Sequence, residues 1–278
     1  MLDCIMDGLL DTLKLMPYLL VTFIILEFLE HKLNKKNQEI LVKNKKFGPL
    51  VGGLLGVFPQ CGFSSMASNL FSGRVITTGT LIAAFLSTSD EMLPIMLGEH
   101  ANINVLVRII LFKLIIGIIV GFTVDFIFKK QEENNKISEI CEEEHCHCSK
   151  DGIIISSIKH SIKIGLFVLI ANLLINILIF KIGEDNISNV LLNKNIFTYF
   201  IASLIGLIPN CASSVILTEL YLSKLITIGS LMAGLLPGSG LGILLLFKTN
   251  KNLKENISIL SIVYFVGVIV GILVDLFI

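Results

Sequence analysis

Long apolar runs separated by short polar segments dominate the chain. Four of these runs, 13–29, 106–128, 162–180 and 257–278, contain few or no charged residues. A helix needs roughly 20 apolar residues to cross a bilayer, so each run is about long enough to span one. Charged residues make up only 16% of the chain, against about a quarter in soluble domains, and the mean hydropathy is +0.83. The pattern predicts an all-α polytopic membrane protein.

Three stretches of the chain repeat, without gaps, at an offset of 150 residues. Residues 56–64 match 206–214, 74–81 match 224–231, and 117–125 match 267–275. Apolar sequences match each other by chance at Leu and Ile, but they do not readily match at Pro, Cys, Thr, Gly and Asp in one register. We therefore predict a duplicated protein, in which each unit has a long helix, a broken region and a second long helix. The predicted boundaries are 1–128 for the first repeat, 129–152 for a linker and 153–278 for the second repeat.

Lysine distribution predicts the orientation of the two repeats. Segments 31–46 and 129–163 hold six Lys each and 248–256 holds three, whereas 98–104 has none and 181–195 has two. Loops rich in Lys and Arg face the cytoplasm. Equivalent loops of the two repeats then lie on opposite sides, so the repeats are inverted and both termini are outside. Inverted repeats are typical of secondary transporters with a substrate site near the membrane midplane.

The region 48–97 must cross the membrane an odd number of times, because it runs from inside to outside. Either one crossing plus a re-entrant hairpin or three short tilted helices would fit its length. Polar breaks with Pro or Gly interrupt this region and its equivalent, and free backbone groups are tolerated in a membrane only where they line a cavity or are buried in protein. We therefore expect a central site outlined by six break residues: Pro59, Gly62, Pro209, Pro237, Gly238 and Gly240.

The paired Pro-x-Cys motifs resemble those of the ten-helix heavy-metal exporters, a family also described as arsenic efflux proteins or manganese transporters and distantly similar to ArsP-type permeases. The resemblance rests on 56–65, 77–94, 141–148, and 206–214 with 234–242. It implies five crossings in each half and efflux of a metal or metalloid. The chain departs from an arsenical site at one point, because a trivalent arsenical favours three thiolates. The membrane region offers only Cys61 and Cys211.

Thiols and amides recur at the two Pro-containing breaks. Cys61 and Cys211 are either buried, inert thiols or a pair of soft ligands that faces the pathway. Gln60 and Asn210 next to them can supply carbonyl oxygens. Ser64 and Ser214 add hydroxyls, although Ser in membrane helices also serves to pack helices closely. We predict that these six residues line the substrate pathway.

Two carboxylates distinguish the first repeat from the second. Asp90 and Glu91 follow Ser-Thr-Ser, whereas the equivalent positions hold Gly240 and Leu241. Carboxylates at membrane depth are costly and mark substrate or proton paths, unless the segment lies near the surface and is solvated. Two carboxylates with amides and hydroxyls suit a hard divalent ion such as Mn²⁺, and thiols shift the preference toward softer metals. For Asp125 and its equivalent Asp275, close to the ends of the last helices, an interfacial role is the favoured interpretation.

The linker contains a dense cluster of metal-binding residue types. Its segment 141–148 reads Cys-Glu-Glu-Glu-His-Cys-His-Cys, a spacing unlike that of a folded zinc finger. Such tracts are typical of flexible metal-binding segments, although a solvated acidic linker with incidental cysteines remains the alternative. The predicted ligands are Cys141, His145, Cys146, His147 and Cys148.

The remaining features narrow the function to transport. The net charge is zero, so the chain lacks the basic surface expected of a nucleic-acid-binding protein. It also lacks nucleotide-binding and phosphorylation motifs, which argues against an ATP-driven pump or an enzyme that uses ATP. We expect no cofactor, with membrane lipid and a metal or metalloid ion as partners. The predicted protein is a multi-pass secondary exporter of the inner (plasma) membrane, with H⁺ or Na⁺ as the coupling ion and homo-oligomerisation left open. The alternative is a transporter of a small organic or oxyanionic solute bound at the N-termini of the broken helices.

Overall fold

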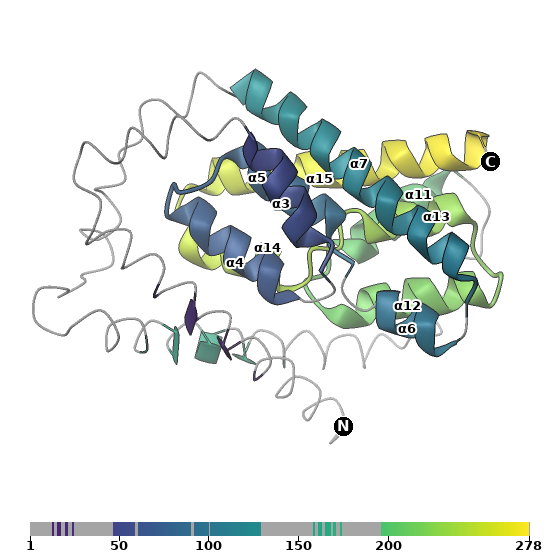
Figure 1. Cartoon of the computed structure of the whole chain (residues 1–278), viewed down its shortest axis with the longest axis horizontal. Helices are drawn as coiled ribbons and strands as arrows, with labels where there is room; N and C mark the ends of the chain where they lie inside the picture. The colour runs from purple at the N-terminus through teal and green to yellow at the C-terminus, as the bar shows by residue number, and fades with distance from the viewer. Residues whose placement is uncertain are drawn as a thin grey trace, which may run out of the picture.

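A computed structural model describes residues 47–58, 61–89, 92–99, 101–128 and 196–277, together with scattered positions in 13–24 and 158–173. The side chains of Cys61, Cys211 and Ala212 lie outside this description. All secondary structure in the described part of the chain is α-helical (Figure 1). The elements are α3 (Gly48–Gly56), α4 (Cys61–Ser72), α5 (Thr78–Ser87), α6 (Met92–Gly98), α7 (Ile103–Phe128), α11 (Phe197–Gly206), α12 (Cys211–Leu222), α13 (Ile228–Leu235), α14 (Leu241–Thr249) and α15 (Leu253–Phe277).

Helices at equivalent places in the two halves make equivalent contacts. In the first half α5 packs between α3 and α7, and in the second half α13 packs between α11 and α15. The two halves also exchange partners, because α4 packs against α14 and α12 packs against α6 (Figure 1). The core is therefore built by both halves together, and its largest buried side chains include Phe71 and Phe85 from the first half and Leu217 from the second.

Among the residues that the structure describes, three segments are long and apolar enough to cross a membrane: Thr78–Gly98, Ile103–Phe128 and Leu253–Phe277. The last two expose large apolar side chains, among them Ile119 and Phe265, which is typical of a surface that faces lipid. By contrast, α3 has 9 residues and α4 has 12. At 1.5 Å per residue each is shorter than about 20 Å, which is less than the roughly 30 Å thickness of the bilayer core. These lengths favour a hairpin plus one crossing over three short crossings.

Glycines allow the central helices to approach each other closely. A Cβ on Gly56 of α3 would lie 2.4 Å from the carbonyl oxygen of Ala84 on α5, and a Cβ on the equivalent Gly206 would lie 1.9 Å from that of Gly234 on α13. Since these contacts are with backbone, no side-chain rearrangement can relieve them. Small residues at helix crossings are the usual way in which membrane helices pack, and this explains why Gly recurs at the two equivalent positions.

Each half also contains an aspartate that caps a central helix. Asp125 of α7 accepts hydrogen bonds from the backbone N–H of Gly79 and from the Thr77 hydroxyl, both 2.7 Å long. Asp275 of α15 likewise accepts from Gly229 N at 2.8 Å and from the hydroxyl of Thr227. The carboxylates thus satisfy N-terminal N–H groups of α5 and α13 and complement the positive ends of their dipoles. Both residues lie near the C-terminal ends of α7 and α15; the interfacial role stays a prediction, and the capping role was not predicted from the sequence.

Candidate functional site

The first break follows α5, whose last turn is closed by its own side chains. Thr88 ends the helix and its hydroxyl donates to the carbonyl oxygen of Ala84, 2.7 Å away, while Ser87 donates to that of Ala83 at 2.8 Å. Ser87, Thr88 and Ser89 are all buried. The predicted ligands Asp90 and Glu91 come next in the sequence and lie outside the described residues, as do Pro59 and Gln60. A buried polar chain segment therefore leads up to the two carboxylates.

The second break separates α13 from α14 and contains three of the predicted break residues. Pro237 is buried, and its carbonyl oxygen accepts from Ser239 N at 2.8 Å. Gly240 has φ 51°, a left-handed conformation that a side chain would disfavour, and it directly precedes α14. Ser239 is fully buried, and its hydroxyl has no hydrogen-bond partner in the part of the chain that the structure describes. Buried polar atoms normally have partners, so this hydroxyl is available to a ligand or to water.

The break before α12 contains Asn210 and Cys211, and the structure describes the Asn210 amide but not the Cys211 thiol. Asn210 is buried, its N–H donates to the carbonyl oxygen of Ile208 at 2.7 Å, and its own carbonyl accepts from Ser213 Oγ at 2.8 Å. Pro209 precedes it in a bend and is half-buried. Ser214, also half-buried, lies in the first turn of α12, where its carbonyl accepts from the Thr218 hydroxyl. Gly62 is the second residue of α4, in the break of the first half that is equivalent to the one before α12.

A line of serines on α4 forms the contact with α14. Ser68 Oγ donates to the carbonyl oxygen of Gly242 at 2.7 Å, and Ser72 shares a hydrogen bond of 2.6 Å with Thr249. Ser64 is fully buried on the same line, and a Cβ on Gly242 would lie 2.9 Å from its Cβ. The packing role that serines often have in membrane helices therefore applies to Ser64. A role of Ser64 in the pathway stays a prediction.

Two further residues on α4 present polar atoms without partners. Ser65 Oγ and both polar atoms of the Asn69 amide are buried and make no hydrogen bond. The sequence indicated Ser65 only as one of several serines that add hydroxyls, and it gave no signal for Asn69, whose equivalent in the second half is Glu219. Like Ser239, they offer oxygen atoms that lack a hydrogen-bond partner among the described residues.

Lys113 is the residue that sequence reasoning missed. It lies in the middle of α7 and only 1% of its surface is exposed. Its ammonium donates to the backbone carbonyl oxygen of Thr88 and to that of Leu235, the latter 2.7 Å away. One amine thus joins the C-terminal ends of α5 and α13, one from each half. The signal was available, because a lone Lys inside an apolar span is a functional hypothesis by default.

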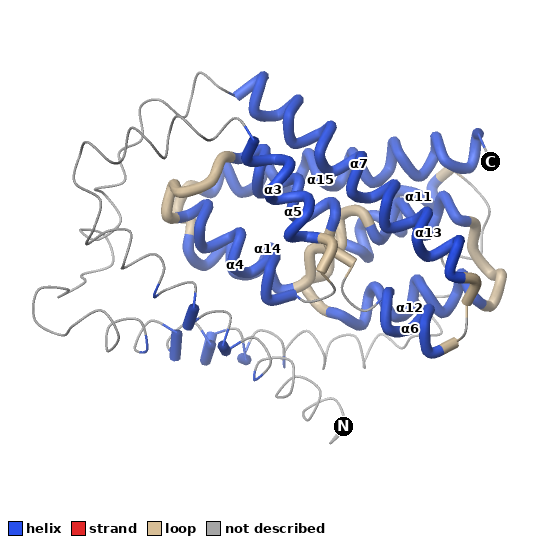
Figure 2. The backbone as a smooth tube through the Cα atoms, in the orientation of Figure 1, coloured by secondary structure: helices blue, strands red, loops and turns tan. Residues whose placement is uncertain are grey.

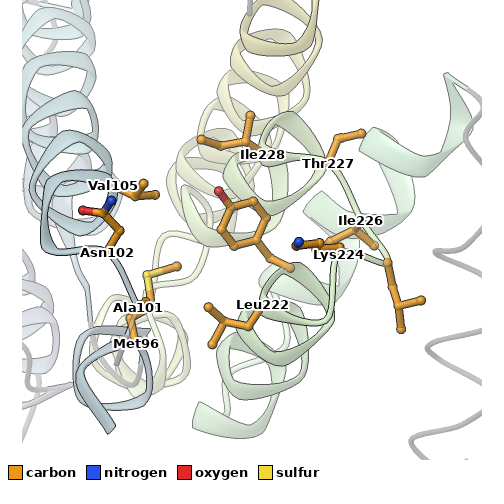
Figure 3. A pocket seen from close by; sticks show the side chains of 11 residues that line it. Met96, Ala101, Asn102, Val105, Leu222, Lys224, Ile226, Thr227 and Ile228 are labelled. Carbon is orange, nitrogen blue, oxygen red and sulfur yellow. The ribbon is translucent and has the colours of Figure 1, made fainter. Parts of the chain in front are cut away.

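The two ends of the molecule differ in polarity. At one end Arg74 forms a 2.9 Å ion pair with Glu255, which also accepts from the Asn250 amide at 3.0 Å. The equivalent residues at the other end are Lys224 and Val105, a pair that cannot form an ion pair, and they line a pocket of about 490 Å³ (Figure 3). None of the predicted site residues lines this pocket, whose walls are mostly apolar.

Metal ligands are sparse in the part of the chain that the structure covers. There, no group of three or more His, Cys, Asp and Glu side chains could hold a metal ion. The predicted linker ligands at 141–148 fall outside the described residues, together with Asp90, Glu91 and the thiols of Cys61 and Cys211. The described part of the site therefore offers backbone carbonyls, hydroxyls and amides, which are oxygen donors suited to hard cations.

Comparison with known families gives a match that extends over nearly the whole chain. The sequence model of a family described as "Putative, 10TM heavy-metal exporter" matches residues 2–184 and 150–278. No curated protein and no solved structure matches the chain. The match confirms the family resemblance read from the paired Pro-x-Cys motifs, and the family's description is that of a membrane exporter.

Proposed function

Because the chain belongs to the family of 10TM heavy-metal exporters, we propose that it exports a metal or metalloid ion across the inner (plasma) membrane as a secondary transporter. The observation that carries the proposal is the pair of interrupted central helices. α5 and α13 each stop inside the protein, and Ser87, Thr88, Ser89 and Ser239 are buried there. Irregular backbone at membrane depth is tolerated where it lines a cavity or is buried in protein, which suits a substrate site.

The proposed architecture is a pair of inverted repeats, 1–128 and 153–278, joined by the linker 129–152. The equivalent helix contacts, the exchanged pairs α4–α14 and α12–α6, and the equivalent capping aspartates support it. The loops that join α4 to α5 and α12 to α13 lie at opposite ends of the molecule, as inversion requires (Figure 2). In this arrangement α3 and α4 form a re-entrant hairpin from one side, and α11 and α12 form one from the other.

The proposed substrate site lies between the breaks of the two repeats. Its charged ligand is Asp90 or Glu91, and neutral ligands come from Gln60, Cys61, Asn210 and Cys211. The buried, polar surroundings of Thr88 and Asn210 support this location. The oxygen donors favour a hard divalent ion such as Mn²⁺, while the two thiols would extend the range to softer metals.

A metal panel tests the proposed function. A strain that lacks the protein should become sensitive to at least one metal or metalloid and should accumulate it, because efflux is lost. Growth across the panel and the intracellular content measured by mass spectrometry would show this, with the restored gene as the control. If no metal or metalloid accumulates, the proposal fails, and transport of an organic or oxyanionic solute becomes the better interpretation.

The inverted topology makes a prediction for labelling from outside the cell. Single cysteines placed in 98–104 and in 181–195 should react with an impermeant thiol reagent in a background without native cysteines. Cysteines in 31–46, 129–163 and 248–256 should not react, because Lys-rich loops face the cytoplasm. Equal reaction at 98–104 and 248–256 would mean that the repeats are parallel.

Segment 141–148 of the linker is proposed to bind a thiophilic divalent metal without taking part in the transport step. Its support is the density of Cys and His in a short polar segment. A variant that lacks 136–150 should keep full export at saturating metal and should need a higher metal concentration to reach half of it. Complete loss of export at normal expression would place the segment in the pathway itself.

A further inference from the structure

We propose that Lys113 is an internal cation that competes with the transported metal ion for the carbonyl ends of α5 and α13. This inference deepens the proposed function, because it states that the site is built for a cation and that a fixed positive charge occupies it in the unloaded protein. It rests on three observations about the ammonium group, namely its burial, its hydrogen bonds to one carbonyl from each half, and its absence from the other half.

The partners of Lys113 are cation ligands of the kind that a transport site uses. Thr88 is the C-terminal cap of α5, and Leu235 is the last residue of α13. Both carbonyls lie at the negative ends of helix dipoles, where positive charge is stabilised. Both carbonyl oxygens accept hydrogen bonds from the Lys113 ammonium, and the distance from Nζ to Leu235 O is 2.7 Å. The space between the two helix ends therefore accepts a cation rather than an anion.

The cost of placing Lys113 here argues against a role in packing alone. A charged side chain at the centre of a membrane helix is energetically costly and is usually kept for a functional reason. The equivalent position on α15 is Val263, which is fully buried and lets α15 pack on α13 without any charge. The fold therefore does not need a cation at this position of the long helix. In the second half the apolar side chain of Val263 fills this position.

The break after α5 links Lys113 to the proposed metal ligands. Thr88, whose carbonyl accepts from Lys113, precedes Asp90 by two residues in the sequence. We take the transported metal ion, whose proposed charged ligand is Asp90 or Glu91, to use the same two carbonyl oxygens as the ammonium. Two like charges in a site of low dielectric repel each other strongly, so that loading the metal requires the ammonium to withdraw.

Metal binding to the purified full chain tests this inference without any transport step. Lys113→Met removes the charge and keeps an apolar stem, so Mn²⁺ should bind the variant at least tenfold more tightly than the parent in titration calorimetry. Added NH₄⁺ at constant ionic strength should raise the unfolding midpoint of the variant and leave that of the parent unchanged, because a free ammonium can fill the vacated place. Lys113→Arg keeps the charge and should bind Mn²⁺ like the parent, and Lys254→Met, at an exposed lysine, is the matched control.

A purely structural lysine gives a different result. In that case Lys113→Met would lower the unfolding midpoint, but Mn²⁺ affinity would stay that of the parent and NH₄⁺ would not rescue stability, and either outcome would overturn the inference. If Lys113→Met does not fold, Lys113→Gln retains an N–H donor without the charge and should show the same gain in Mn²⁺ affinity. Failure of the parent to export any metal would refute the proposed function and leave these binding results standing.

Discussion

Neutralising either carboxylate of the first break, by Asp90→Asn or Glu91→Gln, should reduce export to background. A dehydrated divalent ion needs a negative partner, and removing the partner of a buried charge costs about 3–5 kcal/mol. Since about 1.4 kcal/mol corresponds to tenfold in affinity, the loss should exceed a hundredfold. Efflux of the metal from loaded vesicles that contain the purified chain, measured at subsaturating concentration, would show it.

Two comparisons make this result specific. Glu99→Gln removes a carboxylate of similar size from the exposed end of the same crossing and should leave export unchanged. Cys61→Ser and Cys211→Ser replace neutral or soft ligands, which cost less, on the order of 1–3 kcal/mol, and should shift the preference from soft to hard metals. If both carboxylate variants bind and transport like the parent, the metal site lies elsewhere and the oxyanion interpretation gains weight.

Adding one methyl group at the crossing of α11 and α13, by Gly206→Ala, should strongly destabilise the protein. The new Cβ would lie 1.9 Å from the Gly234 carbonyl oxygen, so the two helices would have to separate. Overpacking of this kind costs about 1–3 kcal/mol and more when backbone must move. In a chain of this size we expect the unfolding midpoint to fall by roughly 5–10 °C.

The matched control for this substitution is Gly98→Ala. A Cβ at Gly98, the last residue of α6, would meet no atom within 4 Å, so its unfolding midpoint should stay within a degree or two of the parent. Thermal unfolding in one detergent would compare the three proteins directly. An unchanged midpoint for Gly206→Ala would mean that α11 and α13 are not held together at this crossing.

The sequence predicted those residues whose role depends only on the conformation of their own stretch of chain. Pro237 and Gly240 mark the second break, and the structure ends α13 and begins α14 on either side of them. Residues that act across the fold were not accessible. For Ser64 the sequence left a pathway role and a packing role open; the structure shows which helix it packs against, α14, and the pathway role stays a prediction. Asp125 was assigned only an interfacial position, and the structure makes it the cap of α5.

The sequence by itself determined the membrane class, the offset of 150 residues and the places where the central helices break. Hydropathy, repeated motifs and helix-breaking residues can be read from short stretches of sequence. The bilayer requires long apolar segments and satisfied backbone groups, so it leaves its mark on such stretches directly. Only the tertiary structure decided that Lys113 joins the ends of α5 and α13, and that Arg74 meets Glu255 from the other half. These contacts link residues far apart in sequence, whose meeting depends on how the helices pack.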